Sequence, residues 1–180
     1  MIGLKRGTVA LLPHREEWGE NAAKTIVQLK EILGNAAVDI QHIGSTAVST
    51  IHAKPILDIV VGVGDLQDVL PCIPLLEQHG FIFRGEVVAG QRLFVMGDSA
   101  HTIRTHHIHV VKWNGTEWNN YIAFRDYLRA FPEKAAAYDA CKRELALRFP
   151  KDRKRYTDSK QEIIDRLLQE ARAWKSGCTR

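Results

Sequence analysis

In the first 112 residues, segments with apolar residues at helical spacing alternate with short apolar runs typical of strands. The remaining residues show helical spacing alone. Apolar side chains recur every three or four positions from Trp18 to Leu33, which predicts an amphipathic helix that Gly34 ends. Shorter apolar or alternating runs predict strands. The predicted strands cover residues 8–12, 37–43, 56–63, 81–84, 91–96 and 102–112. Helices and strands therefore share this part of the chain.

Helical spacing also covers residues 65–79, where Pro71 and Pro74 predict a kink or a break because proline disturbs helix geometry. After Trp113 three further helices are predicted, over residues 117–131, 132–149 and 157–174. We therefore expect an α+β fold in which helices flank a mixed sheet and a helical segment ends the chain. The length suits a single domain over residues 1–180, with an α/β core at 1–112 and a helical extension packed on it at 113–180.

The composition, 45% hydrophobic and 26% charged, is that of an ordinary folded domain. No apolar run reaches the roughly 20 residues of a membrane-spanning helix, and the start of the chain lacks a secretory signal, so we expect a cytoplasmic protein without a membrane partner. Three cysteines without CxxC spacing argue against a disulfide framework. The net charge of +4 is interleaved with acids and has no stacking motif beside it, which does not favour a nucleic-acid partner.

A Gly-Ser-Thr turn supplies the first candidate chemistry. Gly44, Ser45 and Thr46 directly follow the strand predicted over residues 37–43. Glycine lets backbone N–H groups approach a ligand closely, serine adds a hydroxyl donor, and a helical turn beginning at Thr46 would add further N–H groups. This combination suits phosphate oxygens. The same tripeptide is also ordinary turn chemistry.

Asp58 interrupts the apolar run over residues 56–63, where an unpaired carboxylate is costly to keep ionised. A divalent cation such as Mg²⁺, held together with substrate phosphates, would compensate that charge. Alternatively, Asp58 lies at a strand end and bonds to backbone amides, Lys54 or Arg104.

Four ordered segments resemble the GrpB-like family, which is placed in the nucleotidyltransferase superfamily and also occurs fused to dephospho-CoA kinase domains. The segments are QHIGSTAV at 41–48, AKPILDIVVGV at 53–63, RTHHIHV at 104–110 and AFRDYLR at 123–129. The resemblance covers nearly the whole chain. It implies a nucleotidyltransferase-like sheet in which Gly44 and Ser45 hold phosphates and Asp58 is the catalytic residue that holds Mg²⁺ or Mn²⁺.

The superfamily pattern has a second acid two residues after the first, and this chain has Val60 at that position. The third acidic position falls in or near Thr105 to His109, where imidazoles replace carboxylates. Phosphoryl transfer with two metal ions needs carboxylates for both of them, so the departure weakens the expectation of catalysis.

Four of the eight histidines, His101, His106, His107 and His109, lie within nine residues. On an extended strand His107 and His109 point to one face and His106 points to the other. His107, His109 and Asp58 would make a metal-binding set of two histidines and one carboxylate, in which neutral imidazole favours Zn²⁺, Mn²⁺ or Fe²⁺ over Mg²⁺. The alternative is that one histidine bonds to Asp58 while the others face solvent or donate to phosphate.

Arg104, Arg125 and Lys160 are the basic candidates for phosphate binding. Arg104 offers a fork of donors, and Lys160 falls in the first turns of the predicted last helix. In related nucleotidyltransferases a helical lysine or arginine reaches the triphosphate, which implies this role for Arg125 or Lys160. The alternative is surface ion pairing, with Asp126, Asp158 or Glu162 as partners.

Three functions are compatible with these residues. The first is a metal-dependent nucleotidyltransferase-like protein that binds a nucleoside triphosphate and transfers a nucleotidyl group to an acceptor. The second is a non-catalytic module that binds a nucleotide or another phosphorylated small molecule, as the missing second acid suggests. The third is a phosphoesterase with a histidine-bound metal.

Overall fold

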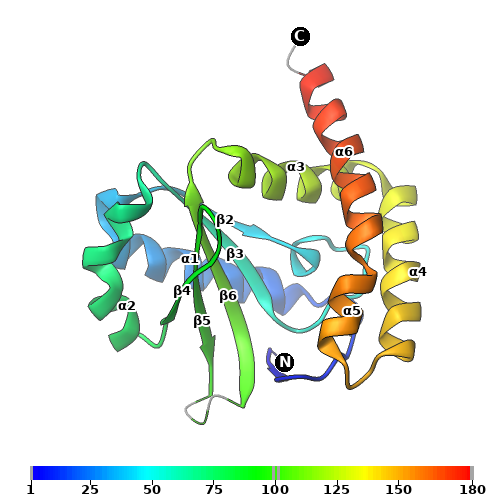
Figure 1. Ribbon diagram of the computed structural model, residues 1–180, viewed down its shortest axis with the longest axis horizontal. Coiled ribbons are helices and arrows are strands. Elements are labelled where there is room, and N and C mark those ends of the chain that lie inside the picture. The colour runs from blue at the N-terminus through cyan, green and yellow to red at the C-terminus, as the bar shows by residue number, and fades with distance from the viewer. Residues whose placement is uncertain (1, 99, 101, 179–180) are drawn as a thin grey trace.

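A mixed sheet of six strands forms the centre of the computed structural model, which describes residues 2–98, 100 and 102–178 (Figure 1). Its strands are β1 (Leu4–Lys5), β2 (Ala37–Ile43), β3 (Leu57–Val63), β4 (Ile82–Val88), β5 (Gln91–Gly97) and β6 (Ile103–Lys112). The order is β2-β3-β6-β5-β4, and β1 pairs with the first residues of β6. Strands β3 and β6 run parallel, whereas the other four pairings are antiparallel.

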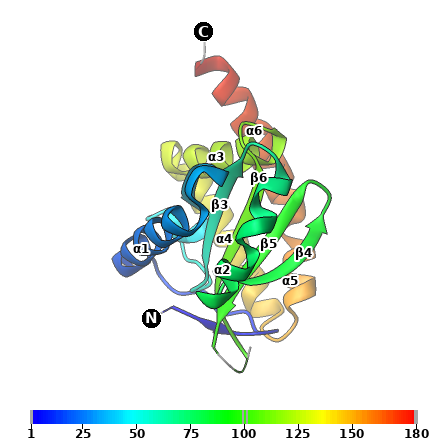
Figure 2. The same cartoon turned by 90° about the vertical axis from the view of Figure 1, so that its left-hand side faces the viewer.

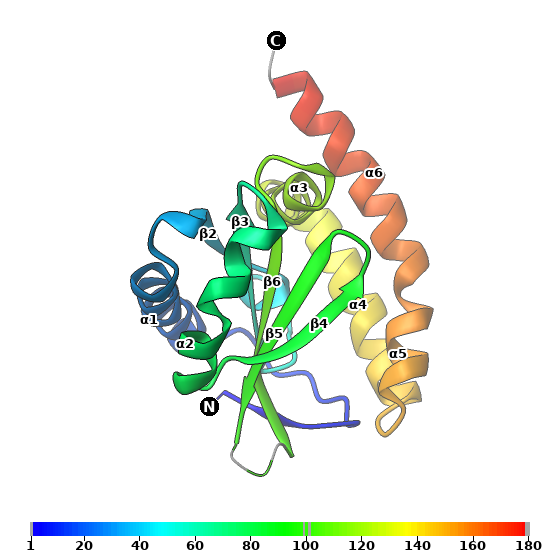
Figure 3. The same ribbon diagram turned by 60° about the vertical axis from the view of Figure 1, so that its left-hand side comes forward.

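Helices cover both faces of this sheet (Figures 2 and 3). They are α1 (Glu16–Leu33), α2 (Ile73–Gln78), α3 (Thr116–Ala130), α4 (Pro132–Arg148), α5 (Arg153–Ser159) and α6 (Gln161–Cys178), with 3-10 turns η1 (Gly34–Ala36), η2 (Ser45–Ala47) and η3 (Leu66–Cys72). Helices α1 and α2 lie on one side, and α3 to α6 lie on the other (Figure 3). The expected α+β fold, with its C-terminal helical segment, is confirmed. Among the described helices, none combines the length and apolar character that crossing a membrane requires.

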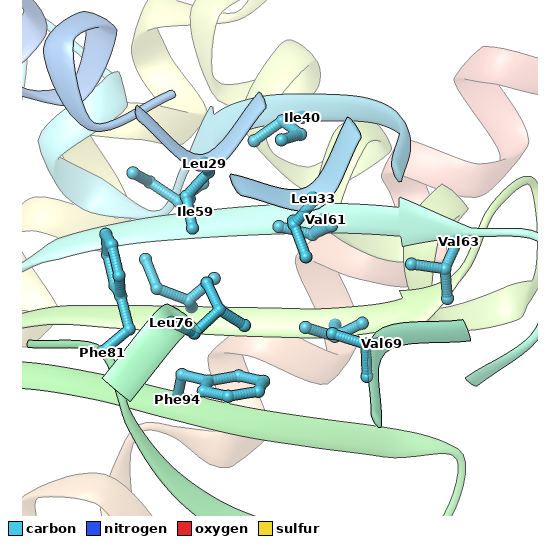
Figure 4. Close-up of a cluster of buried hydrophobic side chains, with 12 residues drawn as sticks. Leu29, Leu33, Ile40, Ile59, Val61, Val63, Val69, Leu76, Phe81 and Phe94 are labelled. Atoms are coloured by element: carbon cyan, nitrogen blue, oxygen red, sulfur yellow. The ribbon is translucent and has the colours of Figure 1, made fainter. Parts of the chain in front are cut away.

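Alternate residues of β3 point to opposite faces of the sheet, and one of these faces carries the main hydrophobic core. Ile59, Val61 and Val63 are fully buried and pack with Leu29 and Leu33 of α1 (Figure 4). Successive strand residues point to opposite faces, so Asp58, Val60 and Gly62 face the C-terminal helices instead. A Cβ at Gly62 would lie 2.9 Å from the Trp118 ring, which shows how closely α3 covers that face.

The loop between β2 and β3 is fixed by the C-terminal helices. Val48 and Ile51 of this loop are each 1% exposed and pack in the second core with Tyr127, Tyr138 and Leu167, which belong to α3, α4 and α6. Burying each such aliphatic side chain contributes about 1.5–3 kcal/mol. The helices therefore hold the loop that carries residues 44–56.

The structure corrects two predicted elements. Residues 8–12 do not form a strand of the sheet. Leu12 makes an isolated bridge to Ala53 in the loop between β2 and β3, and the Val9 N–H donates to the carbonyl of Pro150, which follows α4. The helix predicted over residues 157–174 is two helices, α5 and α6, which meet at Lys160. Lys160 therefore lies at their junction and not in the first turns of α6. The break predicted within 65–79 occurs where η3 gives way to α2.

Candidate functional site

Asp58, His107 and His109 meet on the face that α3 covers. In the parallel pairing of β3 with β6, Asp58 lies opposite His107, and the next residue on the same face, Val60, lies opposite His109. The Asp58 Oδ1 atom is 3.1 Å from His107 Nδ1 and 3.6 Å from His109 Nε2. One ligand atom from each residue falls within 4.8 Å of the others. The sheet register thus brings together the three residues that the sequence suggested as metal ligands.

The Asp58 carboxylate is held in its charged form. Burial raises its pKa, but hydrogen bonds from His107 and His109 and their electrostatic attraction outweigh burial, so the pKa lies well below its usual range. The side chain remains 31% exposed, which leaves the carboxylate accessible to a ligand. His106 points to the other face, where its Nε2 lies 3.2 Å from the Thr25 hydroxyl of α1. His101 lies outside the described residues.

This donor set fits one cation better than two. One carboxylate and two imidazoles match the ligand types that Zn²⁺ and Mn²⁺ accept, whereas Mg²⁺ prefers oxygen ligands alone. The position of the superfamily's second acid is occupied by Val60, which is fully buried against Ile43, Val111 and Trp118. That position belongs to the core, so it offers nothing to a second ion.

Gly44 places a turn directly against Asp58. Its backbone has φ 71° and ψ −172°, a region that is essentially restricted to glycine. A Cβ at this position would lie 2.6 Å from Oδ2 of Asp58. The 3-10 turn η2 begins at Ser45, one residue earlier than the helical turn predicted at Thr46. The first N–H groups of such a turn lack partners within it, so they are available to a ligand.

Ser45 and Thr46 are held by buried neighbours. The Lys142 ammonium donates to the Ser45 hydroxyl over 3.2 Å and also to the carbonyl of His52. Thr46 is 2% exposed, and its hydroxyl lies 2.9 Å from His42 Nε2. Burial lowers the pKa of Lys142 to about 7, although Asp139 raises it. The sequence did not single out Lys142 for the site; the available signal was its i,i+3 spacing from Asp139 on a predicted helix.

Two adjoining cavities meet at Asp58 and form one cleft. The first, the basic lobe, has a volume of about 400 Å³ and includes Lys54, Lys142, Arg153, Tyr156 and His107 in its lining. The second, the aromatic lobe, has a volume of about 410 Å³ and includes Gly44, Tyr121, Phe124, Tyr138 and Asn120. Both lobes are lined by Ser45, Asp58, His109, Tyr121 and Lys160. Thr46 lines the basic lobe.

The other two basic candidates lie elsewhere. The Arg125 guanidinium donates to Gln41 Oε1 over 2.7 Å, to the carbonyl of His42 over 3.0 Å and to Asp126 Oδ1 over 2.7 Å. It therefore ties α3 to β2. Asp126 is one of the partners named in the alternative stated for Arg125, but the Arg125 side chain is only 11% exposed, so the pair is not the surface ion pair expected there. Arg104 lines neither lobe. Of the three basic candidates, the structure brings Lys160 to the cleft.

Sequence comparisons place these features in a family. Residues 8–170 match the family described as GrpB protein. The chain is 38% identical to the glutamate-rich protein GrpB of Alkalihalophilus pseudofirmus, over 94% of this chain and 99% of that protein. It is 32% identical to YqkA of Bacillus subtilis and 27% identical to a dephospho-CoA kinase of Mycolicibacterium paratuberculosis. It spans about half the length of these last two relatives, 49% and 48% respectively.

Solved structures show the same fold. The conserved protein GrpB from Enterococcus faecalis has a TM-score of 0.84 at 31% identity, covering 92% of this chain and 99% of that one. The Cid1 poly(U) polymerase bound to MgATP has a TM-score of 0.54 at 12% identity, covering 76% of this chain and 44% of that one. At that identity the second likeness shows the fold alone. The sheet is therefore nucleotidyltransferase-like, as expected.

Proposed function

The chain belongs to the GrpB family, and from this premise we propose that it binds a nucleoside triphosphate with one divalent cation and transfers the nucleotidyl group to an acceptor. The observation that carries the proposal is that the Gly44-Ser45 turn and the set of Asp58, His107 and His109 open on the same cleft. A metal-bound triphosphate requires donors to its phosphate oxygens and ligands to its cation side by side in one cleft.

Asp58, His107 and His109 would hold the cation, with Mn²⁺ or Zn²⁺ preferred over Mg²⁺ by the two imidazoles. When bound, the cation supplies neutralisation of the charge on the phosphate oxygens. The histidine contacts would orient the Asp58 carboxylate before any ligand arrives, because His107 Nδ1 hydrogen-bonds to Oδ1 over 3.1 Å and His109 Nε2 lies 3.6 Å from the same atom. The protein thus contributes positioning and charge, which are the main terms in phosphoryl transfer.

The two lobes suggest how the nucleotide lies. The Ser45 hydroxyl, the N–H groups of η2 and the Lys160 ammonium would contact the phosphates. The nucleoside would lie in the aromatic lobe against Tyr121 or Phe124, since every base can stack on an aromatic face. In the transfer, an acceptor oxygen bonds to the α-phosphorus while the bond to the bridging oxygen breaks. Pyrophosphate leaves with that electron pair, and the acceptor proton passes to water.

A second function, binding without transfer, is favoured by one observation. Val60 occupies the second acidic position and is fully buried in the core. A protein with the Gly44-Ser45 turn and one cation site has the groups needed to bind a nucleotide. Without the second acid, it lacks a ligand for the second metal ion of nucleotidyl transfer. Under this proposal the chain is a module that binds a nucleotide or another phosphorylated small molecule.

Turnover separates the two functions. The protein would be incubated with each nucleoside triphosphate and Mn²⁺, Mg²⁺ or Zn²⁺, and pyrophosphate release and nucleotide binding would be followed. Asp58→Asn should abolish metal-dependent release, and Asp158→Asn, an exposed acid outside the cleft, should leave it unchanged. Binding without release across all metals would support the second function. Absence of binding would overturn both.

A further inference from the structure

Three cations converge on the basic lobe without carboxylate partners. Lys54 comes from the loop between β2 and β3, Arg153 from the start of α5, and Lys160 from the junction of α5 and α6. Within the described part of the chain, no carboxylate oxygen lies within 4.0 Å of their charged nitrogens. Asp58 lines the same lobe, so one carboxylate faces these three cations, and the remaining excess of positive charge favours the entry of an anion.

The neighbouring cations on α5 behave differently. Lys154 pairs with Asp158 over 2.6 Å, and Arg155 pairs with Asp152 over 3.5 Å. These side chains are exposed and do not line the basic lobe. Helix α5 therefore pairs these two basic residues with acids, whereas Arg153, which is exposed but lines the basic lobe, has no carboxylate of the described residues within 4.0 Å.

Tyr156 holds the two lysines in place of a carboxylate. The Nζ atoms of Lys54 and Lys160 each lie 5.1 Å from the centre of its ring, so they are separated by no more than twice that distance. Tyr156 is fully buried, and its ring lies in the wall of the lobe. An aromatic face attracts an ammonium group without occupying its N–H donors. The donors of both lysines thus remain available to an anion.

The charges already disturb one another. The pKa of Lys54 is lowered to about 8, mainly by burial and also by repulsion from Lys160 and Arg153, which outweighs the attraction of Asp58. Burial also lowers the pKa of Lys160; attraction by Asp58 opposes this shift, and repulsion from Arg153 adds to it to a smaller extent. An anion with several charges would relieve both the desolvation and the repulsion.

We propose that Lys54, Arg153, Lys160 and Tyr156 form a polyphosphate subsite that binds a chain of two or more phosphates independently of the base and of the metal. The three side chains carry more positive charge than a single phosphate can offset, whereas a diphosphate or triphosphate chain offers more charge and more oxygens to the same donors. The inference deepens the proposed function, and it rests on that function only for the claim that the chain belongs to a nucleotide.

Calorimetric titration with inorganic tripolyphosphate, in a metal-chelating buffer, tests the subsite. We expect one site per chain and at least about tenfold weaker binding of orthophosphate. Arg153→Gln and Lys54→Gln should each weaken tripolyphosphate binding by about tenfold or more, because each removes a charged donor. Lys154→Gln, on the same helix but outside the lobe, should bind as the wild type does. Should Lys54→Gln fail to fold, the exposed Arg153 still provides the test.

Absence of tripolyphosphate binding, or equal binding by the wild type and Arg153→Gln, would overturn the subsite. Its failure can be told apart from failure of the proposed function. Nucleoside triphosphate binding that needs Asp58 but ignores Arg153 and Lys54 would remove the subsite and keep the function. Tripolyphosphate binding without any metal-dependent nucleotide binding would keep the subsite, with free polyphosphate as its ligand, and remove the function.

Discussion

Gly44 and Asp58 are in such close contact that any side chain at position 44 would reach the carboxylate: its Cβ would lie 2.6 Å from Oδ2. The contact is set by the sheet, because Ile43 pairs with Asp58 between β2 and β3 and the turn leaves β2 at the next residue. The residues assigned to phosphate and those assigned to the cation are therefore fixed relative to each other by strand register.

Gly44→Ala should damage both parts of the site. The backbone conformation at this position costs of order 1–3 kcal/mol for a residue with a Cβ, and the added methyl group displaces the Asp58 carboxylate. We expect a loss of that size in the free energy of unfolding and a loss of Mn²⁺ affinity. Gly19→Ala is the control: it lies in helix α1 with open space around it, and should stabilise the protein by about 0.5–1 kcal/mol. Unchanged metal affinity in folded Gly44→Ala would contradict the contact.

The two faces of β6 should differ in metal binding. His107→Ala and His109→Ala each remove a nitrogen ligand and should weaken Mn²⁺ or Zn²⁺ binding by about tenfold or more, as measured by calorimetry after removal of bound metal. His106→Ala, whose imidazole bonds to Thr25 on the other face, should leave metal affinity unchanged. Equal affinities in all three variants would show that the cation is bound elsewhere.

Lys142 should make stability depend on pH. Its pKa is lowered to about 7 in the folded protein from 10.5, so between these values the unfolded chain binds one more proton and stability rises with pH. The free energy of unfolding of the wild type, relative to Lys142→Met, should therefore increase from pH 7 to pH 9. Lys24→Met, at an exposed position on α1, should show no such trend. If the difference in unfolding free energy between the wild type and Lys142→Met did not change from pH 7 to pH 9, the Lys142 ammonium would not be desolvated in the folded protein.

Tripolyphosphate binding should weaken as pH rises. Lys54, whose pKa is lowered to about 8, must carry its proton to bind phosphate, and the bound anion raises that pKa again. Binding at pH 8 to 9 should consequently take up more protons in the wild type than in Lys54→Gln, which calorimetry in buffers of different ionisation enthalpy measures. Equal proton exchange in the two proteins, or an affinity that rises with pH, would contradict the role of Lys54.

Local patterns were sufficient to predict much of the sheet, whereas the grouping of Asp58 with His107 and His109 rested on the family resemblance together with strand alternation. The apolar run around Asp58 and the strand alternation of His107 and His109 each depend on neighbours in sequence, and the expected strand β2 matches its observed bounds. Lys160 and the segment 8–12 were misplaced because their structures depend on distant partners. Val9 bonds to Pro150, and the break at Lys160 follows no proline or glycine.

The basic lobe could not be predicted for the same reason. Lys54, Arg153 and Tyr156 are about a hundred residues apart in sequence at their extremes, and they meet because the C-terminal helices fold back over the sheet (Figure 1). Arg125 shows the converse: its charge and helical position suggested phosphate, but the carbonyl of His42 and the acid of Asp126 occupy its donors. Which donors remain available is a property of packing that spacing alone does not reveal.

A crystal structure of the protein soaked with Mn²⁺ and a non-hydrolysable nucleoside triphosphate tests the cleft most directly. The anomalous signal of Mn²⁺ should lie at ligand distance from Asp58, His107 and His109, with the phosphates against Ser45 and Lys160. Anomalous signal elsewhere, or phosphates bound away from the Gly44-Ser45 turn, would contradict the proposal that this cleft holds a metal-bound triphosphate.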